Sequence, residues 1–190
     1  MARSPALSLA LLAVGLAAAS GCSGRRADYM PLAVGNRWDY RVVRSDGGSS
    51  RHSMVITGKV SELVYEADDG GQRCLWSKED GWVARQAGGL VAYLLYLPPA
   101  AGVKWQNVVA GRKLKIWCRI AGRETVSVPA GTFPGCPVVV MEPAGGKTER
   151  RYWFAPDVGW VRYSYGPRGG RPWLVRELVD YQLEKPGAGG

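Results

Sequence analysis

The 190-residue chain has few of the residues that build common active sites. It contains one histidine, which excludes sites built on two or more imidazoles, including most catalytic zinc sites and the two-histidine iron oxygenases. No apolar run reaches the roughly 18–20 residues that a membrane-spanning helix needs. The 26 glycines follow no regular period, so a collagen-like chain is excluded. Hydrophobic residues make up 46% of the chain, which favours a packed domain over a disordered one.

The first 21 residues have the pattern of an export signal. Arg3 precedes an apolar stretch over residues 6–19, and small residues follow it. The apolar stretch is too short to span a membrane, as is usual in a cleaved signal. Removing these 21 residues, which hold one of the 25 basic residues, leaves 169 residues with a net charge of +8.

Residues 19–22, Ala-Ser-Gly-Cys, resemble the lipobox of bacterial lipoproteins. The resemblance implies that Cys22 is acylated and becomes the N-terminus, although Ala19 replaces the commoner leucine. The alternative is an ordinary cysteine after an ordinary cleavage site. Because each buried methylene contributes about 0.8 kcal/mol, three acyl chains would form a stable membrane anchor. Similarity to enterobacterial lipoproteins with Ser23 after the cysteine implies the outer membrane.

The remaining chain is expected to form a tether at 22–28, one domain at 29–184 and a frayed tail at 185–190. Three cysteines lie in the domain, and an odd number leaves at least one unpaired. Cys118 is expected to be a small buried residue, and a bridge between Cys74 and Cys136 is favoured, although sequence cannot choose among the three pairings. No pair has the spacing of a metal site, so we expect neither a metal nor a cofactor.

The domain is expected to be all-β, an antiparallel meander that forms a half-open or closed barrel-like sheet. Short runs of β-branched and aromatic residues alternate with turns of Gly, Pro, Asp and Asn. Residues 174–183 would also fit a helix, but we favour a strand. The expected strands cover residues 37–44, 52–60, 63–67, 72–77, 82–86, 90–97, 113–120, 125–128, 137–142, 150–154, 160–165 and 174–183.

The clearest strand, at 113–120, predicts one buried and one solvated face. The inward residues are Leu114, Ile116, Cys118 and Ile120. The outward residues are Lys113, Lys115, Trp117 and Arg119. This cationic face suits anionic lipid head groups, an acidic wall polymer or an envelope protein, whereas export makes nucleic acid inaccessible. The alternative is an ordinary solvated surface.

The sequence predicts no catalytic residues. His52 follows a Gly-Ser-rich loop and is expected to be an exposed residue at a strand edge, and a Gly-x-Ser-x-Gly motif is absent. Asp68-Asp69 and Glu79-Asp80 precede glycines, which is typical of solvated turns. Residues 145–148, Gly-Gly-Lys-Thr, lack the first glycine of a phosphate-binding loop and lie between two expected strands.

All 19 aromatic residues lie in the mature chain. Most are expected to be ordinary core, but aromatic rings could also line a half-closed barrel that holds an apolar ligand.

Three runs resemble a family of bacterial secreted proteins and lipoproteins that has no agreed activity. They are residues 29–40 (YMPLAVGNRWDY), 124–136 (ETVSVPAGTFPGC) and 152–161 (YWFAPDVGWV). The resemblance implies export and a β-rich fold, similar in outline to the unclosed barrels of lipoprotein-carrier (Lol) proteins.

These features lead us to expect a non-enzymatic, lipid-anchored envelope protein that binds an apolar or amphiphilic envelope component. One alternative is a structural module that docks another envelope protein through its basic face. The other is a hydrolase that works without histidine and would need two carboxylates within about 10 Å of each other. A continuous apolar cavity would favour the first hypothesis, and a filled core with a flat patch would favour the second.

Overall fold

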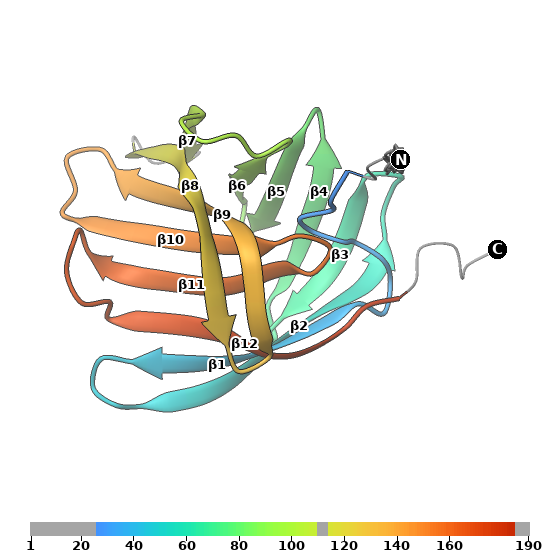
Figure 1. Cartoon of the computed structure of the whole chain (residues 1–190). Coiled ribbons are helices and arrows are strands. Elements are labelled where there is room, and N and C mark those ends of the chain that lie inside the picture. Colours follow the sequence, from blue (N-terminus) through green and yellow to red (C-terminus); the bar gives the residue numbers. More distant parts are fainter. Residues whose placement is uncertain (1–25, 110–113, 185–190) are drawn as a thin grey trace, which may run out of the picture.

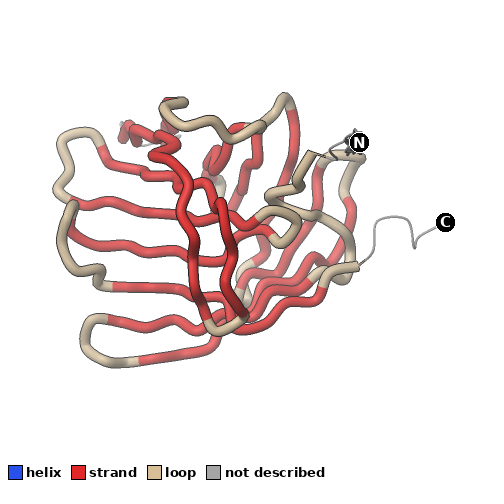
Figure 2. The backbone as a smooth tube through the Cα atoms, in the orientation of Figure 1, coloured by secondary structure: helices blue, strands red, loops and turns tan. Residues whose placement is uncertain are grey.

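The computed structural model describes residues 26–109 and 114–184, and this part of the chain is strand apart from the connecting turns (Figure 2). The signal segment, Cys22, Lys113 and the tail lie outside the described residues. The strands are β1 (Arg37–Arg44), β2 (Ser49–Lys59), β3 (Val64–Asp69), β4 (Arg73–Glu79), β5 (Trp82–Ala87), β6 (Leu90–Tyr96), β7 (Lys104–Val109), β8 (Leu114–Val128), β9 (Gly131–Pro143), β10 (Thr148–Ala155), β11 (Gly159–Pro167) and β12 (Leu174–Gln182).

All twelve strands form one antiparallel sheet in the order β6-β5-β4-β3-β2-β1-β12-β11-β10-β9-β8-β7 (Figure 1). Strands that are neighbours in sequence therefore pair, except β6 and β7, which are the two edges of the sheet, and β1 pairs with β12. The sheet curves until its two edge strands meet, which confirms the expected all-β, barrel-like meander. The segment 174–183 is strand β12 in the structure, and no helix among the described residues is long and apolar enough to cross a membrane.

The edges of the sheet are joined by side chains instead of a strand ladder. The amide of Asn107 on β7 accepts a hydrogen bond from the Tyr93 N–H of β6 and donates one to the Tyr93 carbonyl, both at 3.1 Å. Trp105 Nε1 donates to the same carbonyl at 3.0 Å. Asn107 is buried, so these bonds satisfy an inward polar side chain and nearly close the barrel.

Residues 28–32 pack across one end of the barrel. The Asp28 carbonyl accepts a hydrogen bond from Asp157 N of the β10–β11 turn, and Asp28 N donates to the Asp157 carboxylate. The Asp28 carboxylate accepts a hydrogen bond from Lys78 Nζ at 2.7 Å. Tyr29, Met30 and Leu32 are buried. Asp28, expected in the tether, is thus already part of the fold, and this end of the barrel is sealed.

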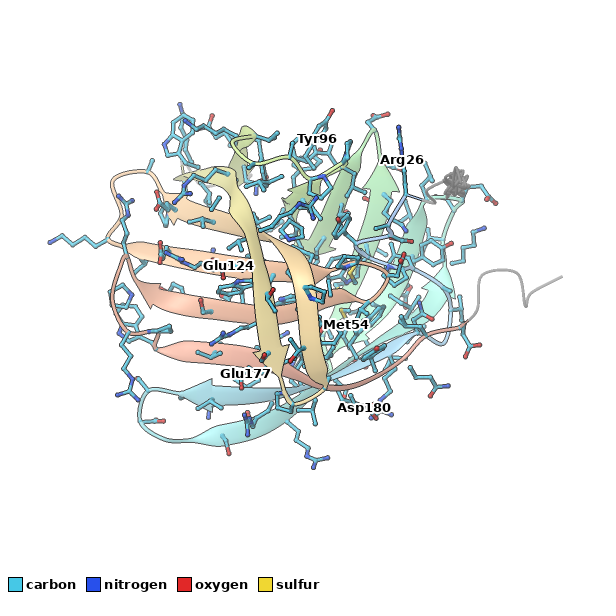
Figure 3. The ribbon with its side chains drawn as sticks, in the orientation of Figure 1. Arg26, Met54, Tyr96, Glu124, Glu177 and Asp180 are labelled. Atoms are coloured by element: carbon cyan, nitrogen blue, oxygen red, sulfur yellow. The ribbon has the colours of Figure 1, made fainter. Side chains whose placement is uncertain are left out.

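The sealed half of the interior is filled with large side chains. Trp38, Met54, Ile56, Trp76 and Phe154 are fully buried, and Met54 is labelled in Figure 3. Trp38 Nε1 donates to the Val158 carbonyl at 2.7 Å, which satisfies its only polar atom. The core is therefore packed at this end, although the indole N–H of Trp76 has no acceptor among the described residues.

Strands β8 and β9 bend at two bulges, and their far part crosses β10, β11 and β12 (Figure 1). Glu124 on β8, labelled in Figure 3, accepts a hydrogen bond from Trp153 Nε1 at 2.8 Å. Ala130 N donates to the Leu178 carbonyl at 3.0 Å. Because Trp153 points away from its inward neighbour Tyr152, the hairpin covers the outer face of the sheet. The expected strands 113–120 and 125–128 are thus two parts of β8.

The alternation expected for residues 113–120 is largely confirmed. Cys118 and Ile120 are buried, and Lys115, Trp117 and Arg119 are exposed. The expectation for Leu114 is wrong, since it is 38% exposed. It is the first residue of β8 and pairs with Val109 at the end of the edge strand, where no other strand covers it.

The three cysteines of the described chain are buried free thiols, so the favoured Cys74–Cys136 bridge is not formed. Cys74 lies on β4 opposite Ala67, whereas Cys136 lies on β9, and β4 and β9 are not neighbours in the sheet. Each thiol packs into its own part of the core. Burial raises the pKa of Cys118 to about 12 and that of Cys136 to about 11, so both remain protonated.

Candidate functional site

A cavity of about 260 Å³ lies inside the barrel, between two walls of the sheet. Strands β2, β3, β5 and β6 form one wall, and β10, β11 and β12 form the other. Its polar lining consists of His52, Asp69, Gln72, Arg85 and Arg176. Its other lining residues are Ala92, Leu94, Tyr152, Trp160 and Tyr163.

Asp69 is the centre of a charged group that we call the Asp69 cluster, formed by His52, Asp69, Arg85 and Arg176. Its oxygen Oδ1 contacts His52 Nε2 and lies 3.5 Å from Arg176 Nη1. Its oxygen Oδ2 lies 2.5 Å from Arg85 Nη2. One carboxylate thus holds side chains from β2, β5 and β12.

Strand register places these side chains on the inner face. His52 pairs with Tyr40, Asp69 with Met54, Arg85 with Trp76 and Arg176 with Val42, so each lies opposite a buried residue. Side chains of directly paired residues share one face of a sheet. The inward position of all four follows from the alternation of the strands.

Gly70, directly after Asp69, leaves room for the histidine ring. It has φ of 67°, and a Cβ at this position would overlap the ring of His52. Gly70 N donates to the Ser53 carbonyl at 2.8 Å, which fixes the β3–β4 turn beside β2. A glycine is needed here both for the positive φ and for the close approach.

The cluster carries excess positive charge. Burial by itself raises the pKa of Asp69, but the hydrogen bond with His52 and the positive charges of Arg85 and Arg176 outweigh burial and lower this pKa. Asp69 is therefore a carboxylate at neutral pH. Two guanidinium groups face this one carboxylate, so at least one positive charge is not neutralised within the cluster.

Aromatic rings surround the arginine of β12. The guanidinium carbon of Arg176 lies 5.0 Å from the ring centroid of Trp160 and 5.6 Å from that of Tyr40. Tyr40 OH donates to the Trp160 carbonyl at 2.9 Å. Cation–π contacts of this length stabilise the arginine while leaving its N–H groups available.

Two nitrogens of the lining arginines, Arg85 Nε and Arg176 Nε, are enclosed without an acceptor among the described residues. Leaving a buried donor unpaired costs about 1–3 kcal/mol. The side chains of His52, Arg85 and Arg176 remain 19%, 23% and 18% exposed, so solvent reaches the cluster. The cavity thus has accessible positive charge, which suits a ligand that brings a negative charge.

Two sequence expectations are corrected by this geometry. His52 is not an exposed edge residue, because β2 begins at Ser49 and places it three residues inside the strand, facing inward. Asp69 is not a turn residue, because β3 continues through it. Asp68 does support the turn, where its carboxylate accepts a hydrogen bond from Gly71 N at 2.6 Å. Asp80 also lies in a turn, as expected, with φ of 50°.

The expected cationic face lies on the other side of the sheet. Lys115 and Arg119 are exposed on the outer face of β8 and flank Trp117, which is 55% exposed. Val108 pairs with Lys115 and is also exposed. The structure therefore brings cationic and apolar side chains together on β7 and β8, but it does not join them to the Asp69 cluster.

Comparisons with known proteins show the fold of the chain. No family model matches it, and no curated protein is similar to it. A protein from Bacteroides fragilis, described as an exported protein with a YmcC-like fold, is 16% identical with a TM-score of 0.54, over 83% of this chain and all of that one. A protein from Parabacteroides distasonis, described as a lipoprotein, is 14% identical with a TM-score of 0.55, over 84% of this chain and all of that one. The chain shares the fold of these two proteins.

Proposed function

We propose that this chain is a non-enzymatic, lipid-anchored protein of the bacterial cell envelope that binds an amphiphilic envelope component in its barrel. The observation that carries the proposal is the Asp69 cluster, which presents excess positive charge to an aromatic-lined cavity. The resemblance of residues 19–22 to a lipobox and the exported and lipoprotein descriptions of the two structural neighbours support the location.

The size of the cavity indicates which part of an amphiphile would enter. At about 260 Å³ it is smaller than the roughly 300–1,000 Å³ of typical small-molecule pockets. The sealed half of the interior is already filled by Trp38, Met54 and Phe154. A polar head group fits these dimensions, whereas a long acyl chain would extend beyond the cavity.

The composition of the cavity supports binding over catalysis. His52 and Asp69 form an imidazole–carboxylate pair, but none of the described lining residues is a serine, threonine or cysteine that the pair could activate. Asp69 is the one carboxylate among these lining residues, whereas a glycosidase-like site needs two. We therefore propose neither type of hydrolase.

Native mass spectrometry of the protein extracted from its own membrane tests this function. We expect a noncovalent species that is released on denaturation, and Arg176→Gln should reduce its occupancy. Trp117→Ala, a change on the outer face, serves as the matched control and should leave occupancy unchanged. An empty protein in gentle extraction, with wild type and both variants alike, would contradict the proposal.

A second candidate function is docking of another envelope protein through β7 and β8. It is favoured by the exposed Trp117 and Val108 beside Lys115 and Arg119. Such mixtures of aromatic and cationic side chains are common in protein interfaces. Cross-linking in cells should then identify a partner that is lost in Trp117→Ala combined with Arg119→Glu and kept in Arg176→Gln.

A further inference from the structure

We infer that the cavity at the Asp69 cluster is a site for one small anionic group, a carboxylate or a phosphate, held by Arg85 and Arg176. The inference deepens the proposed function and rests on it, because it names the chemistry of the head group that the barrel would bind. It depends on four observations: charge, unused donors, access and the arrangement of the aromatic rings.

Charge balance is the first observation. Arg85 and Arg176 both contact the single carboxylate of Asp69. One of the two positive charges therefore has no negative partner within the cluster. Arg150 adds another cation on the same wall, with its guanidinium 5.4 Å from the Tyr165 ring. Buried charges are normally paired, because an isolated ion in a protein interior is strongly unfavourable. One further anion would neutralise the group.

The terminal nitrogens that Asp69 leaves unused give the direction of recognition. Asp69 contacts Nη2 of Arg85 and Nη1 of Arg176, whereas Nη1 of Arg85 and Nη2 of Arg176 donate to none of the described residues. The Nε atoms of both arginines are enclosed within the protein and also lack an acceptor there. A guanidinium has five N–H groups in a planar fork, which matches the two oxygens of a carboxylate or the oxygens of a phosphate. Asp69 holds both forks in place, so the site is formed before a ligand arrives.

Access and shape limit the size of the anion. Arg85 and Arg176 are each about one-fifth exposed, so an anion can reach them without a rearrangement of the sheet. Tyr152, Trp160 and Tyr163 line the cavity, and their ring centroids lie 4.9–5.8 Å apart. This packed aromatic wall leaves room for a compact head group and offers apolar contact to the carbon atoms next to it.

The single histidine provides a site-specific probe. His52 is the only histidine of the chain and contacts Asp69, so its ring NMR signals report on the cluster without further assignment. The experiment uses the whole mature chain, residues 22–190, without a histidine tag and with Cys22→Ser to prevent acylation. The probes are dodecanoate, dodecyl phosphate and the neutral dodecanol, each below its micelle concentration, together with acetate and inorganic phosphate.

We expect dodecanoate or dodecyl phosphate to shift the His52 ring signals in a saturable manner and dodecanol to leave them unchanged. Arg176→Gln should lower the affinity for the anion by roughly 10- to 100-fold, as expected for loss of a charge-assisted hydrogen bond. Arg162→Gln, on the outer face over Trp153, is the matched control and should bind like wild type. Arg85→Lys, which keeps the charge but loses the fork, should retain the fold and bind with intermediate affinity.

The remaining outcomes separate the inference from the function on which it rests. If acetate or phosphate binds as tightly as the long-chain anions, the anion site stands and the amphiphile proposal fails. If dodecanol competes equally with dodecanoate, an amphiphile binds but the anion inference is wrong. If no anion shifts the His52 signals of the folded protein, the inference is overturned.

Discussion

Asp69 is the residue on which the interior site depends. It is buried and contacts three side chains from three different strands, so it holds two walls of the barrel together. The hydrogen bond with His52 and the charges of Arg85 and Arg176 lower its pKa despite burial. The same contacts therefore link the stability of the domain to pH.

Asp69→Asn should destabilise the domain by about 3 kcal/mol at pH 7, because it leaves two partly buried guanidinium groups without their carboxylate. Between the lowered folded pKa and the unfolded value near 3.8, the unfolded chain binds more protons than the folded one. The contribution of Asp69 is thus complete above about pH 4 and is lost as pH falls through the folded pKa. Urea unfolding at several pH values checks both effects.

Glu62→Gln is a suitable control for this measurement, because Glu62 is almost fully exposed. It should change the free energy of unfolding by less than about 0.5 kcal/mol at any of these pH values. An Asp69→Asn protein whose acid sensitivity equals that of wild type would contradict the role given to Asp69.

Gly70 and Gly71 offer a matched pair beside His52. Both have positive φ, 67° and 85°, but a Cβ at Gly70 would meet the His52 ring, whereas a Cβ at Gly71 would meet nothing within 4 Å. Gly71→Ala should lower the free energy of unfolding by about 1 kcal/mol from backbone strain alone. Gly70→Ala should lower the free energy of unfolding by more and should also shift the His52 ring NMR signals. Equal unfolding energies and unchanged ring signals would show that the close approach is not important.

The sequence contained part of the information needed to find this site. His52, Met54 and Ile56 alternate along β2, so the inward position of His52 could have been inferred from the two apolar residues after it. Asp69 could not be distinguished from Asp68 in the same way, because both precede a Gly-Gly turn. The meeting of Arg85 and Arg176 depends on curvature that brings β5 and β12 to one cavity, and no local pattern encodes it.

At the scale of elements, the strands with regular alternation were predictable and the irregular ones were not. Strand β1 has the expected bounds, 37–44, and β12 differs by one residue. Strand β7 was missed because Gln106 and Asn107 interrupt its apolar pattern. The structure explains the asparagine, whose side chain bonds to the main chain of β6 at the seam. Gly122, between the expected strands 113–120 and 125–128, lies beside a bulge within β8.

The seam between β6 and β7 depends on the side chain of Asn107. Asn107→Ala removes both hydrogen bonds to Tyr93 and should destabilise the domain by about 1–3 kcal/mol. Amide hydrogen exchange should accelerate in β6 and β7 while β1 and β12 remain protected. Gln106→Ala is the control, because the Gln106 amide nitrogen has no partner among the described residues. Similar exchange in both variants would contradict the idea that Asn107 closes the barrel.

Over the whole molecule, the N-terminal segment joins the barrel at its sealed end. The described chain begins at Arg26 and is attached at Asp28 to the sealed end of the barrel, through Lys78 at one end of β4. Asp69 lies across the β3–β4 turn from the other end of β4. Acylation at Cys22 would therefore hold the sealed end toward the membrane.

Cys22→Ala should release the protein from the membrane without changing its fold. We expect the wild-type chain to fractionate with membranes and to show an added mass for three acyl chains under denaturing conditions. The variant should be soluble, lack this mass and unfold at the same urea concentration. A wild-type chain cleaved after residue 21 but not acylated would contradict the anchored location.

The proposed site at the Asp69 cluster holds an anionic group of an envelope component. The most direct test compares the His52 ring NMR signals of isotope-labelled protein extracted gently from its own membrane with those of the same protein after removal of all noncovalent lipid and refolding. We expect the signals to shift on removal and to return when the extracted acidic lipid fraction is added back. Identical signals in the two folded samples would contradict it.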